Sequence, residues 1–378
     1  MISRNWEVTL LLSEFGRKVK VSVFGGSHEP FIGVTIEGLP KGQKIDMDRV
    51  QSFLNRRAPG GGPFSTSRTE SDVAEVKSGL HNGVTFGPPV TVIIANTDIN
   101  SADYSEFYNK PRPSHADYTA RLKYGDSLNM SGGGPFSGRM TAPLCIAGAI
   151  ALQYLENFGV NIGAHIFSIG KIKDEPFSVV GSPCMSLRSL KEDPFPVISE
   201  NAGLAMQEAI LSAHEAGDSL GGVVECCATG VPAGIGGPMY DGVESALSGI
   251  FFGIPAVKGV EFGAGFGSAL RKGSENNDAF YFDDRGEVRT RTNNHGGILG
   301  GVTSGMPVIA RIAFKPAPSI GLVQDTVNLE TKENETIEIK GRHDPCVVPR
   351  AVPAVEAAMA AGLLDLMLCD EGGKYEFR

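Results

Sequence analysis

The order of strand-like and helix-like segments along the chain constrains its fold most. Short runs rich in β-branched and apolar residues predict strands at 18–24, 90–95, 223–228, 257–262 and 308–314. Apolar residues at helical spacing predict helices at 141–158, 201–216, 241–252 and 351–368. The two kinds of segment do not alternate regularly, as they would in a doubly wound parallel sheet. The sequence therefore predicts an α+β fold.

The length and apolar content of the chain favour one large domain. Its 378 residues and 41% hydrophobic content are enough for a sizeable core, and no linker-like stretch divides it. We therefore expect a single domain. Residues 159–200 and 321–340 are the least regular, so we expect loops or insertions there. Asn201 is expected to cap the helix that follows it.

Charge and cysteine usage exclude several classes of partner. A formal net charge of −9 disfavours binding to nucleic acid or to an anionic membrane, so a bound phosphate must be held by a local basic pocket. No apolar run approaches the length of a membrane span. Six cysteines without a CxxC pair, among them the adjacent Cys226 and Cys227, indicate buried thiols in a reducing, cytoplasmic compartment. The sequence has no P-loop, zinc-ligand spacing or GxSxG motif, and we expect no metal.

Glycine is far above its usual share of ~7%, at 49 of 378 residues, and the excess lies in clusters that also hold charged residues. Gly25 and Gly26 follow a predicted strand and precede His28. A ligand can therefore approach this imidazole closely, and histidine suits proton transfer near neutral pH. Arg57 precedes the triglycine at 60–62 and a run of hydroxyl residues. Guanidinium forks, hydroxyls and free backbone N–H groups suit a phosphate or carboxylate.

Two further clusters lie downstream. One joins Arg112 and His115 to the glycine-rich stretch that ends at Arg139, where a predicted helix begins. A helix N-terminus at that point suits an anion. The other is 293–301 (NNHGGILGG), followed by Lys315.

Each of these features also has a simpler interpretation. A lone histidine is usually a surface residue or a satisfied core residue, and we interpret His81, His165 and His214 in this way. A lone glycine-rich loop is usually a turn. His28 and His115 differ because glycine, proline and arginine surround both. The residues alone predict an enzyme with a polyanion pocket and two candidate acid–base histidines.

Taken together, the clusters resemble the chorismate synthase family over residues 15–368. The most specific parts are 112–118 (RPSHADY) and 341–353 (GRHDPCVVPRAVP). Further matching segments are 25–28, 137–141 (SGRMT), 217–225 (GDSLGGVVE), 255–263 (PAVKGVEFG), 293–307 and 315–319 (KPAPS).

The resemblance implies a sandwich of helices and antiparallel sheets and a homotetramer. It also implies a single catalytic domain over 13–370, preceded by a disordered extension over 1–12, because those residues come before the usual start of the family. It implies a lyase that removes phosphate and a ring hydrogen from 5-enolpyruvylshikimate 3-phosphate by trans-1,4-elimination, giving chorismate for aromatic amino acid biosynthesis. The implied cofactor is reduced, noncovalent FMN, which is used without net redox change. NADPH is expected only as a reductant of the flavin.

The resemblance also implies roles for individual residues, by matching position. His28 would protonate the leaving phosphate, His115 would protonate the reduced flavin, and Asp344 would act with the flavin as the base. The implied flavin contacts are Ser137, Ala256, Gly300, Lys315, Ser319 and Arg342, with Lys315 at the FMN phosphate. The implied substrate-binding residues are Arg57, Arg112 and Arg139.

The chain departs from the family pattern at several positions. Pro63, Ser131 and Pro135 stand where relatives often carry arginine, which bears on the substrate pocket. Ser114 replaces a frequent glycine, so the backbone there is expected to avoid a glycine-only conformation. These departures leave open a flavin-binding homologue that has lost lyase activity. An electron-transfer flavoprotein is disfavoured, because the sequence shows no flavodoxin-like series of strands and helices.

Overall fold

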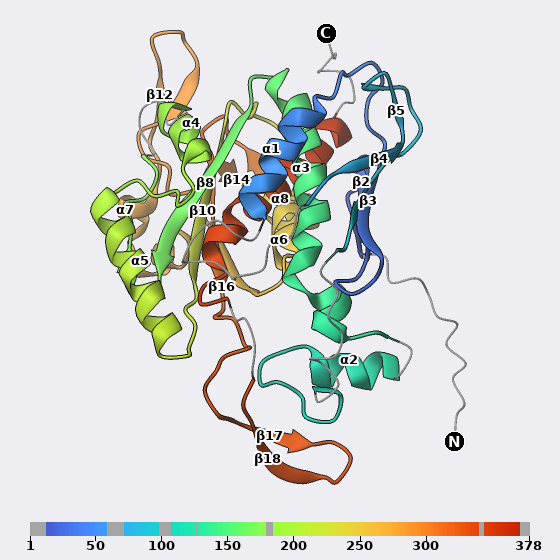
Figure 1. Ribbon diagram of the computed structural model, residues 1–378. Coiled ribbons are helices and arrows are strands. Elements are labelled where there is room, and N and C mark those ends of the chain that lie inside the picture. Colours follow the sequence, from blue (N-terminus) through green and yellow to red (C-terminus); the bar gives the residue numbers. More distant parts are fainter. Residues whose placement is uncertain are drawn as a thin grey trace.

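The computed structural model describes residues 13–58, 72–97, 107–125, 128–178, 184–339 and 344–370, and shows two sheets with helices between and beside them (Figure 1). The first sheet is antiparallel throughout. Its strands lie in the order β1 (Ser13–Phe15), β2 (Lys20–Gly25), β3 (Phe31–Glu37), β7 (Val90–Ala95) and β4 (Glu75–Ser78).

The second sheet is also antiparallel and comes from the later part of the chain. Its strands lie in the order β11 (Val257–Phe262), β16 (Val308–Phe314), β10 (Gly222–Thr229), β8 (Asn161–Ile169) and β9 (Ile172–Lys173). Four two-stranded pairs complete the described strands: β5 (Leu80–His81) with β6 (Val84–Thr85), β12 (Phe280–Phe282) with β13 (Val288–Thr290), β14 (Ile298–Leu299) with β15 (Val302–Thr303), and β17 (Gln324–Asn328) with β18 (Glu333–Ile337).

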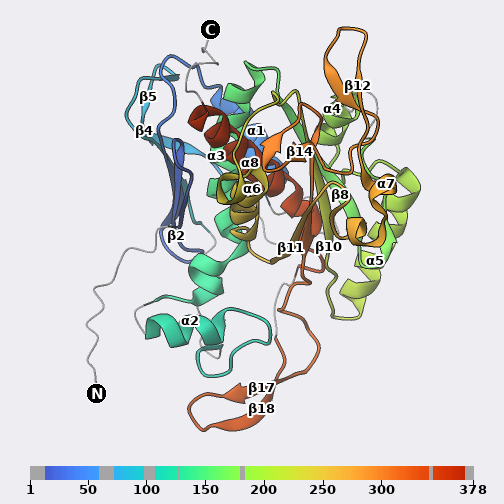
Figure 2. The same ribbon diagram turned by 180° about the vertical axis from the view of Figure 1, so that it is seen from behind.

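Helices fill the space between the two sheets and cover the outer face of the second one (Figures 1 and 2). The inner helices are α1 (Met47–Arg57), α3 (Thr141–Glu156), α6 (Val243–Phe252) and α8 (Val348–Cys369). The outer helices are α4 (Cys184–Glu192) and α5 (Glu200–Glu215). Smaller helices are α2 (Asp117–Tyr124), α7 (Gly273–Asn276) and the 3₁₀ segments η3 (Ser131–Phe136), η4 (Gly138–Met140), η5 (Met239–Asp241) and η6 (Gly265–Leu270). This arrangement confirms the predicted α+β fold of helices and antiparallel sheets.

The packing of α3 against α8 forms the centre of the core. Small residues let the two helix backbones approach closely: a Cβ atom at Gly148 of α3 would lie 2.2 Å from the Cα of Ala357 in α8. By length and composition α8 could cross a membrane, contrary to the sequence-based expectation, but its most apolar window is 94% buried inside the fold. Its apolar residues therefore form the protein core, where neighbouring side chains replace water on every face.

Two buried carboxylates of α8 are matched by partners from distant parts of the chain. Glu356 accepts hydrogen bonds from Arg56 of α1 at 2.6 and 2.9 Å and from the backbone N–H of Ala164 in β8 at 3.0 Å. Asp365 accepts the backbone N–H groups of residues 17–19, just before β2. Because a buried charge is costly unless it is paired and hydrogen-bonded, these contacts fix how α1, β2 and β8 lie on α8.

Most predicted elements are present with boundaries shifted by a few residues. The helix expected at 141–158 ends at Glu156, and the one expected at 351–368 begins earlier, at Val348. The predicted cap at Asn201 is wrong: Ser199 is the N-cap, and its hydroxyl accepts the N–H of Ala202 at 3.5 Å. Cys226 and Cys227 are fully buried, as expected.

The two regions expected to be loops contain regular structure. Residues 159–200 include β8, which pairs with β10 and β9 in the second sheet. His165 lies in the middle of β8 and is fully buried, held by Asp174 and Glu225 at 3.0 Å each. Residues 321–340 include the β17–β18 hairpin, which projects from the molecule beside α2 (Figure 1). The expected extension over 1–12 lies outside the described residues.

Candidate active site

The two candidate acid–base histidines face the same glycine-rich loop, which is residues 131–136 (the glycine loop). Ser27 places His28 by a contact of 3.2 Å between its Oγ and the imidazole Nδ1, and the same hydroxyl donates to the carbonyl of Ser131 at 3.1 Å. Gly132 has a φ of +60°, and a Cβ there would lie 2.0 Å from His28 Cε1. At Gly133 a Cβ would lie 3.5 Å from His115 Nε2. The loop thus lies against both imidazoles, and His28 requires glycine at 132.

His115 is held by a buried carboxylate and an arginine. Its Nδ1 lies 2.6 Å from Asp117 Oδ1. Arg112 binds the same carboxylate through Nε and Nη2, at 2.8 Å each. Burial alone would raise the pKa of Asp117, but hydrogen bonds from Arg112 and His115 outweigh burial and hold that pKa well below its usual range. The carboxylate is therefore ionised at neutral pH.

Several of the predicted flavin-contact residues lie around this network. Arg112 Nη1 donates to Ser319 Oγ at 3.3 Å. The backbone N–H of Lys315 donates to the carbonyl of Ala256 at 3.0 Å, and the Lys315 ammonium donates to the carbonyl of Ser114. Burial, and then the positive charge of Lys258, lower the pKa of Lys315. Within the described residues, no carboxylate is among the groups that shift this pKa.

Ser137 and Ser114 sit at the edges of this group. The Ser137 hydroxyl accepts the N–H of Arg139 at 3.3 Å and caps η4. Ser114 has a φ of +61°, so the expectation that it avoids the region favoured by glycine is wrong. The contact of its carbonyl with the Lys315 ammonium and the turn from Arg112 to His115 hold it there.

Gly300 does not lie with the other predicted flavin contacts. It forms the turn between β14 and β15, whose backbone bonds to residues 234–243. In both views β14 lies well away from α2 and from the β17–β18 hairpin (Figures 1 and 2). Arg342 and Pro63 lie outside the described residues.

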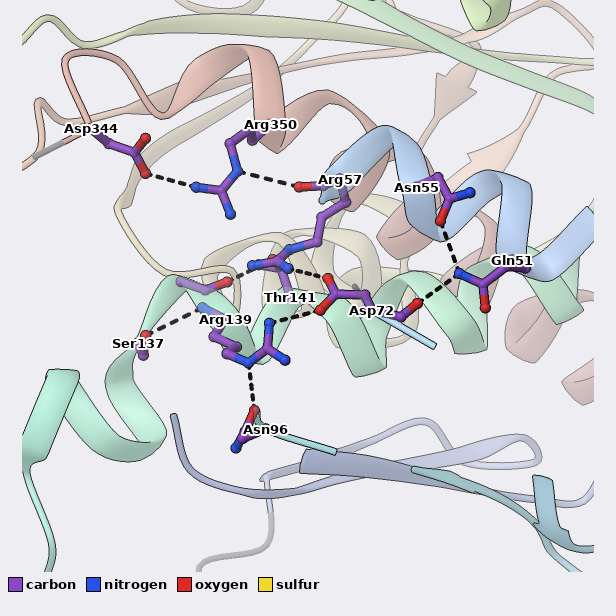
Figure 3. Close-up of polar contacts among 11 residues, drawn as sticks. Gln51, Asn55, Arg57, Asp72, Asn96, Ser137, Arg139, Thr141, Asp344 and Arg350 are labelled. Carbon is purple, nitrogen blue, oxygen red and sulfur yellow. Dashed lines mark hydrogen bonds and ion pairs between the residues drawn. The ribbon is translucent and has the colours of Figure 1, made fainter. Parts of the chain in front are cut away.

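Arg57 and Arg139 share one buried carboxylate, that of Asp72 (Figure 3). Arg57 Nη1 lies 2.6 Å from Asp72 Oδ2, and Arg139 Nη1 lies 2.8 Å from Asp72 Oδ1. The amide of Gln51 in α1 fixes the backbone of Asp72 by donating to its carbonyl at 2.6 Å. Two guanidinium groups against one carboxylate leave this buried cluster with a net positive charge. Burial, and then the nearby charge of Arg350, lower the pKa of Arg57.

Asp344 lies next to this cluster at the start of α8 (Figure 3). Its Oδ2 accepts a hydrogen bond from Arg350 Nη1 at 2.8 Å. Arg350 in turn donates through Nε to the carbonyl of Arg57 at 3.3 Å. The predicted base and the predicted substrate-binding arginine are therefore neighbours.

Asn96 connects the arginine cluster to the His28 loop. Its Oδ1 accepts a hydrogen bond from Arg139 Nε at 2.6 Å. Its Nδ2 donates to the carbonyls of Gly26 and Glu29, at 3.0 and 2.7 Å, on both sides of His28. One continuous set of contacts thus joins the cluster of Arg57, Asp72 and Arg139 to the segment that carries His28.

Sequence reasoning missed four residues of this site: Asp72, Asn96, Asp117 and Arg350. Asn96 directly follows the predicted strand 90–95, and Asp117 lies inside the distinctive 112–118 motif. Their positions in the sequence could therefore have marked both residues as candidates for the site. Asp72 is separated from its arginine partners by 15 and 67 residues, and no local pattern marks it.

The sequence and the fold resemble those of known proteins. The profile of the chorismate synthase family matches residues 19–368. The protein named chorismate synthase from Korarchaeum cryptofilum is 45% identical over 93% of this chain and 96% of the relative, and that from Lancefieldella parvula is 45% identical over 95% and 97%. A crystal structure of chorismate synthase superimposes with a TM-score of 0.75 and 26% identity, covering 96% of this chain and 95% of the other.

These matches define the class of the protein: it is an enzyme, a lyase, built here from two antiparallel sheets around buried helices. The chain belongs to the chorismate synthase family.

Proposed function

We propose that this chain eliminates phosphate from 5-enolpyruvylshikimate 3-phosphate to give chorismate, with reduced FMN as a cofactor that undergoes no net oxidation. The proposal rests on family membership and on one observation above all. His28 and His115 lie against the same glycine loop at Gly132 and Gly133, and Asn96 ties the segment that carries His28 to the positive cluster of Arg57 and Arg139. A departing phosphate needs both a proton and nearby positive charge, and this arrangement supplies them together.

Residues around Lys315 fit an FMN phosphate. Lys315 and Lys258 bring two positive charges close enough to lower the pKa of Lys315, which an anion would relieve. Ala256 and Ser319 lie beside Lys315 and Arg112, and Ser137 lies beside the glycine loop. When bound there, reduced FMN would supply transient electron donation that assists loss of the phosphate.

The protein's own residues then have separable roles. His28, held by Ser27, donates a proton to the leaving phosphate. Arg57 and Arg139 stabilise the anion in a site shielded from water, where their charges act more strongly than in solution. Asp344, held by Arg350, is the base for the ring proton. Ser131 and Pro135 stand where relatives often carry arginine, and the backbone carbonyl of Ser131 accepts the Ser27 hydroxyl.

The exposed apolar surface favours a homo-oligomer, and we propose the tetramer that the family implies. Phe282 of the β12–β13 hairpin is 75% exposed, and Phe266 and Leu270 of η6 are 81% and 91% exposed. Tyr240 in η5 is 88% exposed. Several large apolar side chains exposed to this degree are what a surface covered by another subunit would present. Light scattering should give about four times the 39.9 kDa chain mass, whereas the mass of a single chain would contradict the proposal.

The alternative is a flavin-binding homologue without lyase activity. Under either hypothesis we propose a cytoplasmic protein that does not bind nucleic acid. Purified protein is incubated without oxygen with 5-enolpyruvylshikimate 3-phosphate and FMN. In one sample the FMN has first been reduced with dithionite, and in the other NADPH is the only reductant. We expect chorismate with dithionite-reduced FMN and none with NADPH alone, because we propose that the protein depends on flavin reduced by another source. Tight FMN binding without product would favour the alternative.

A further inference from the structure

Asp117 is the residue of the His115 network to which sequence reasoning gave no role. It is the first residue of α2, and its side chain is only 6% exposed. Its Oδ2 accepts Nε of Arg112 at 2.8 Å and the backbone N–H of Arg112 at 3.1 Å. Its Oδ1 accepts Nη2 of Arg112 at 2.8 Å and lies 2.6 Å from His115 Nδ1.

The contacts of His115 Nδ1 determine which ring nitrogen carries the proton. Arg112 Nη2 lies 3.1 Å from Nδ1 and can only donate, whereas the Asp117 carboxylate at 2.6 Å can only accept. The two contacts require opposite tautomers. The contact with Asp117 prevails, because it is shorter and joins the ring N–H to an ionised acceptor. The proton therefore lies on Nδ1, and Nε2 is the nitrogen toward the glycine loop at Gly133.

We propose that Asp117 is the positioning residue for His115: it fixes the proton on Nδ1 and leaves Nε2 to exchange a proton within the site. This inference rests on the proposed function only for the part that His115 plays in the reaction. Two further charged groups contact the residues around His115. Arg112 keeps Asp117 ionised and links it to Ser319, and the Lys315 ammonium binds the carbonyl of Ser114 next to His115.

Arg112 accordingly supports His115 through Asp117, in addition to the substrate-binding role predicted for it. Three of its nitrogens are engaged, Nε and Nη2 by Asp117 and Nη1 by Ser319. The ring of Phe107 lies 4.6 Å from its guanidinium carbon. Loss of Arg112 would then also act through Asp117 and His115.

An Asp117→Asn substitution separates this role from simple support of α2. An asparagine has one oxygen, and three donor groups of Arg112 together with His115 compete for it. Placing the oxygen toward Nε and the backbone N–H of Arg112 satisfies two fixed donors and turns the amide NH₂ toward His115. His115 Nδ1 can accept a hydrogen bond from this NH₂ only if the ring proton moves from Nδ1 to Nε2.

The test is the tautomer of His115, read from ring nitrogen chemical shifts in protein with ¹⁵N-labelled histidine and no flavin. The signal is assigned by its loss in His115→Gln, and spectra are recorded where the ring is neutral. We expect Nδ1–H in the wild type and in Asp117→Glu, and Nε2–H in Asp117→Asn. Asp325→Asn, on the exposed side of β17, is the matched control and should leave the tautomer unchanged.

Turnover is measured on the same variants. A wrong tautomer should lower kcat of Asp117→Asn by ~10²–10⁴-fold, with recovery in Asp117→Glu. A wild-type spectrum that shows the proton on Nε2 would overturn the inference by itself. An Asp117→Asn variant with the same tautomer and the same turnover as the wild type would also overturn it. If the wild type shows Nδ1–H and makes no chorismate, the positioning by Asp117 stands and the proposed function falls.

Discussion

Replacing Gly132 with alanine should disable His28 while leaving the fold intact. The new Cβ would lie 2.0 Å from His28 Cε1, 2.3 Å from His28 Nδ1 and 3.0 Å from Ser27 Oγ. Carbon atoms in contact stay ~3.5 Å apart or more, so the imidazole must retreat by about 1.5 Å. It would then lose the position set by Ser27.

The size of the effect follows from this displacement. Misplacing a reacting group by ~1 Å costs about 10²-fold, and losing a proton-transfer group altogether costs ~10²–10⁴-fold. We therefore expect kcat to fall by ~10²–10⁴-fold. The left-handed backbone at Gly132, with a φ of +60°, adds a loss of about 1–2 kcal/mol in unfolding free energy when a Cβ is present.

Gly286→Ala is the matched control, because Gly286 also has a positive φ of +75° and nothing lies within 4 Å of its Cβ position. Urea unfolding should show a similar loss of stability in both variants, and chorismate formation should fall only in Gly132→Ala. Equal turnover in the two variants would refute the placement of His28 against this loop.

Three further substitutions test other parts of the structure. Asp72→Asn leaves two buried guanidinium groups without their shared carboxylate and should lower the unfolding free energy by about 3–5 kcal/mol in a urea titration; an unchanged midpoint would contradict the cluster. Lys315→Gln should raise the Kd for FMN by roughly 10–100-fold in a fluorescence titration, the value of a charged hydrogen bond, while Lys77→Gln on the exposed strand β4 should not. Burial alone would lower the pKa of His165, but its hydrogen bonds to Asp174 and Glu225 outweigh burial and raise it, so its contribution to stability is complete below pH ~6.5 and is lost as pH rises through the raised pKa. The destabilisation caused by His165→Gln should thus be largest in acid and shrink toward alkaline pH, and a gap that widens with pH would show the opposite sign.

Local patterns in the sequence predicted those parts of the fold that depend on neighbouring residues. The β-branched run at 90–95 forms β7 with the predicted boundaries, and the apolar segment at 351–368 lies within α8. The strand β8 was not predicted, because Gly163 and His165 interrupt its apolar run. His165 is tolerated there because Asp174 and Glu225 reach it from other elements, which no local pattern reveals.

The same limit applies to the site. Motifs identified His28, His115 and the arginines, since glycine and proline mark the loops that carry them. They did not identify which carboxylate each arginine binds. Asp72 meets Arg139 from 67 residues away, and only the packing of α1, α3 and the first sheet brings the two together.

The most direct test of the proposed function is the balance of the reaction over many turnovers. Protein, a small amount of dithionite-reduced FMN and a large excess of 5-enolpyruvylshikimate 3-phosphate are mixed without oxygen, and chorismate, free phosphate and flavin absorbance are followed together. The account predicts equal amounts of chorismate and phosphate, far exceeding the FMN present, with the flavin still reduced at the end. Phosphate without chorismate, or oxidation of one flavin for each product formed, would contradict it.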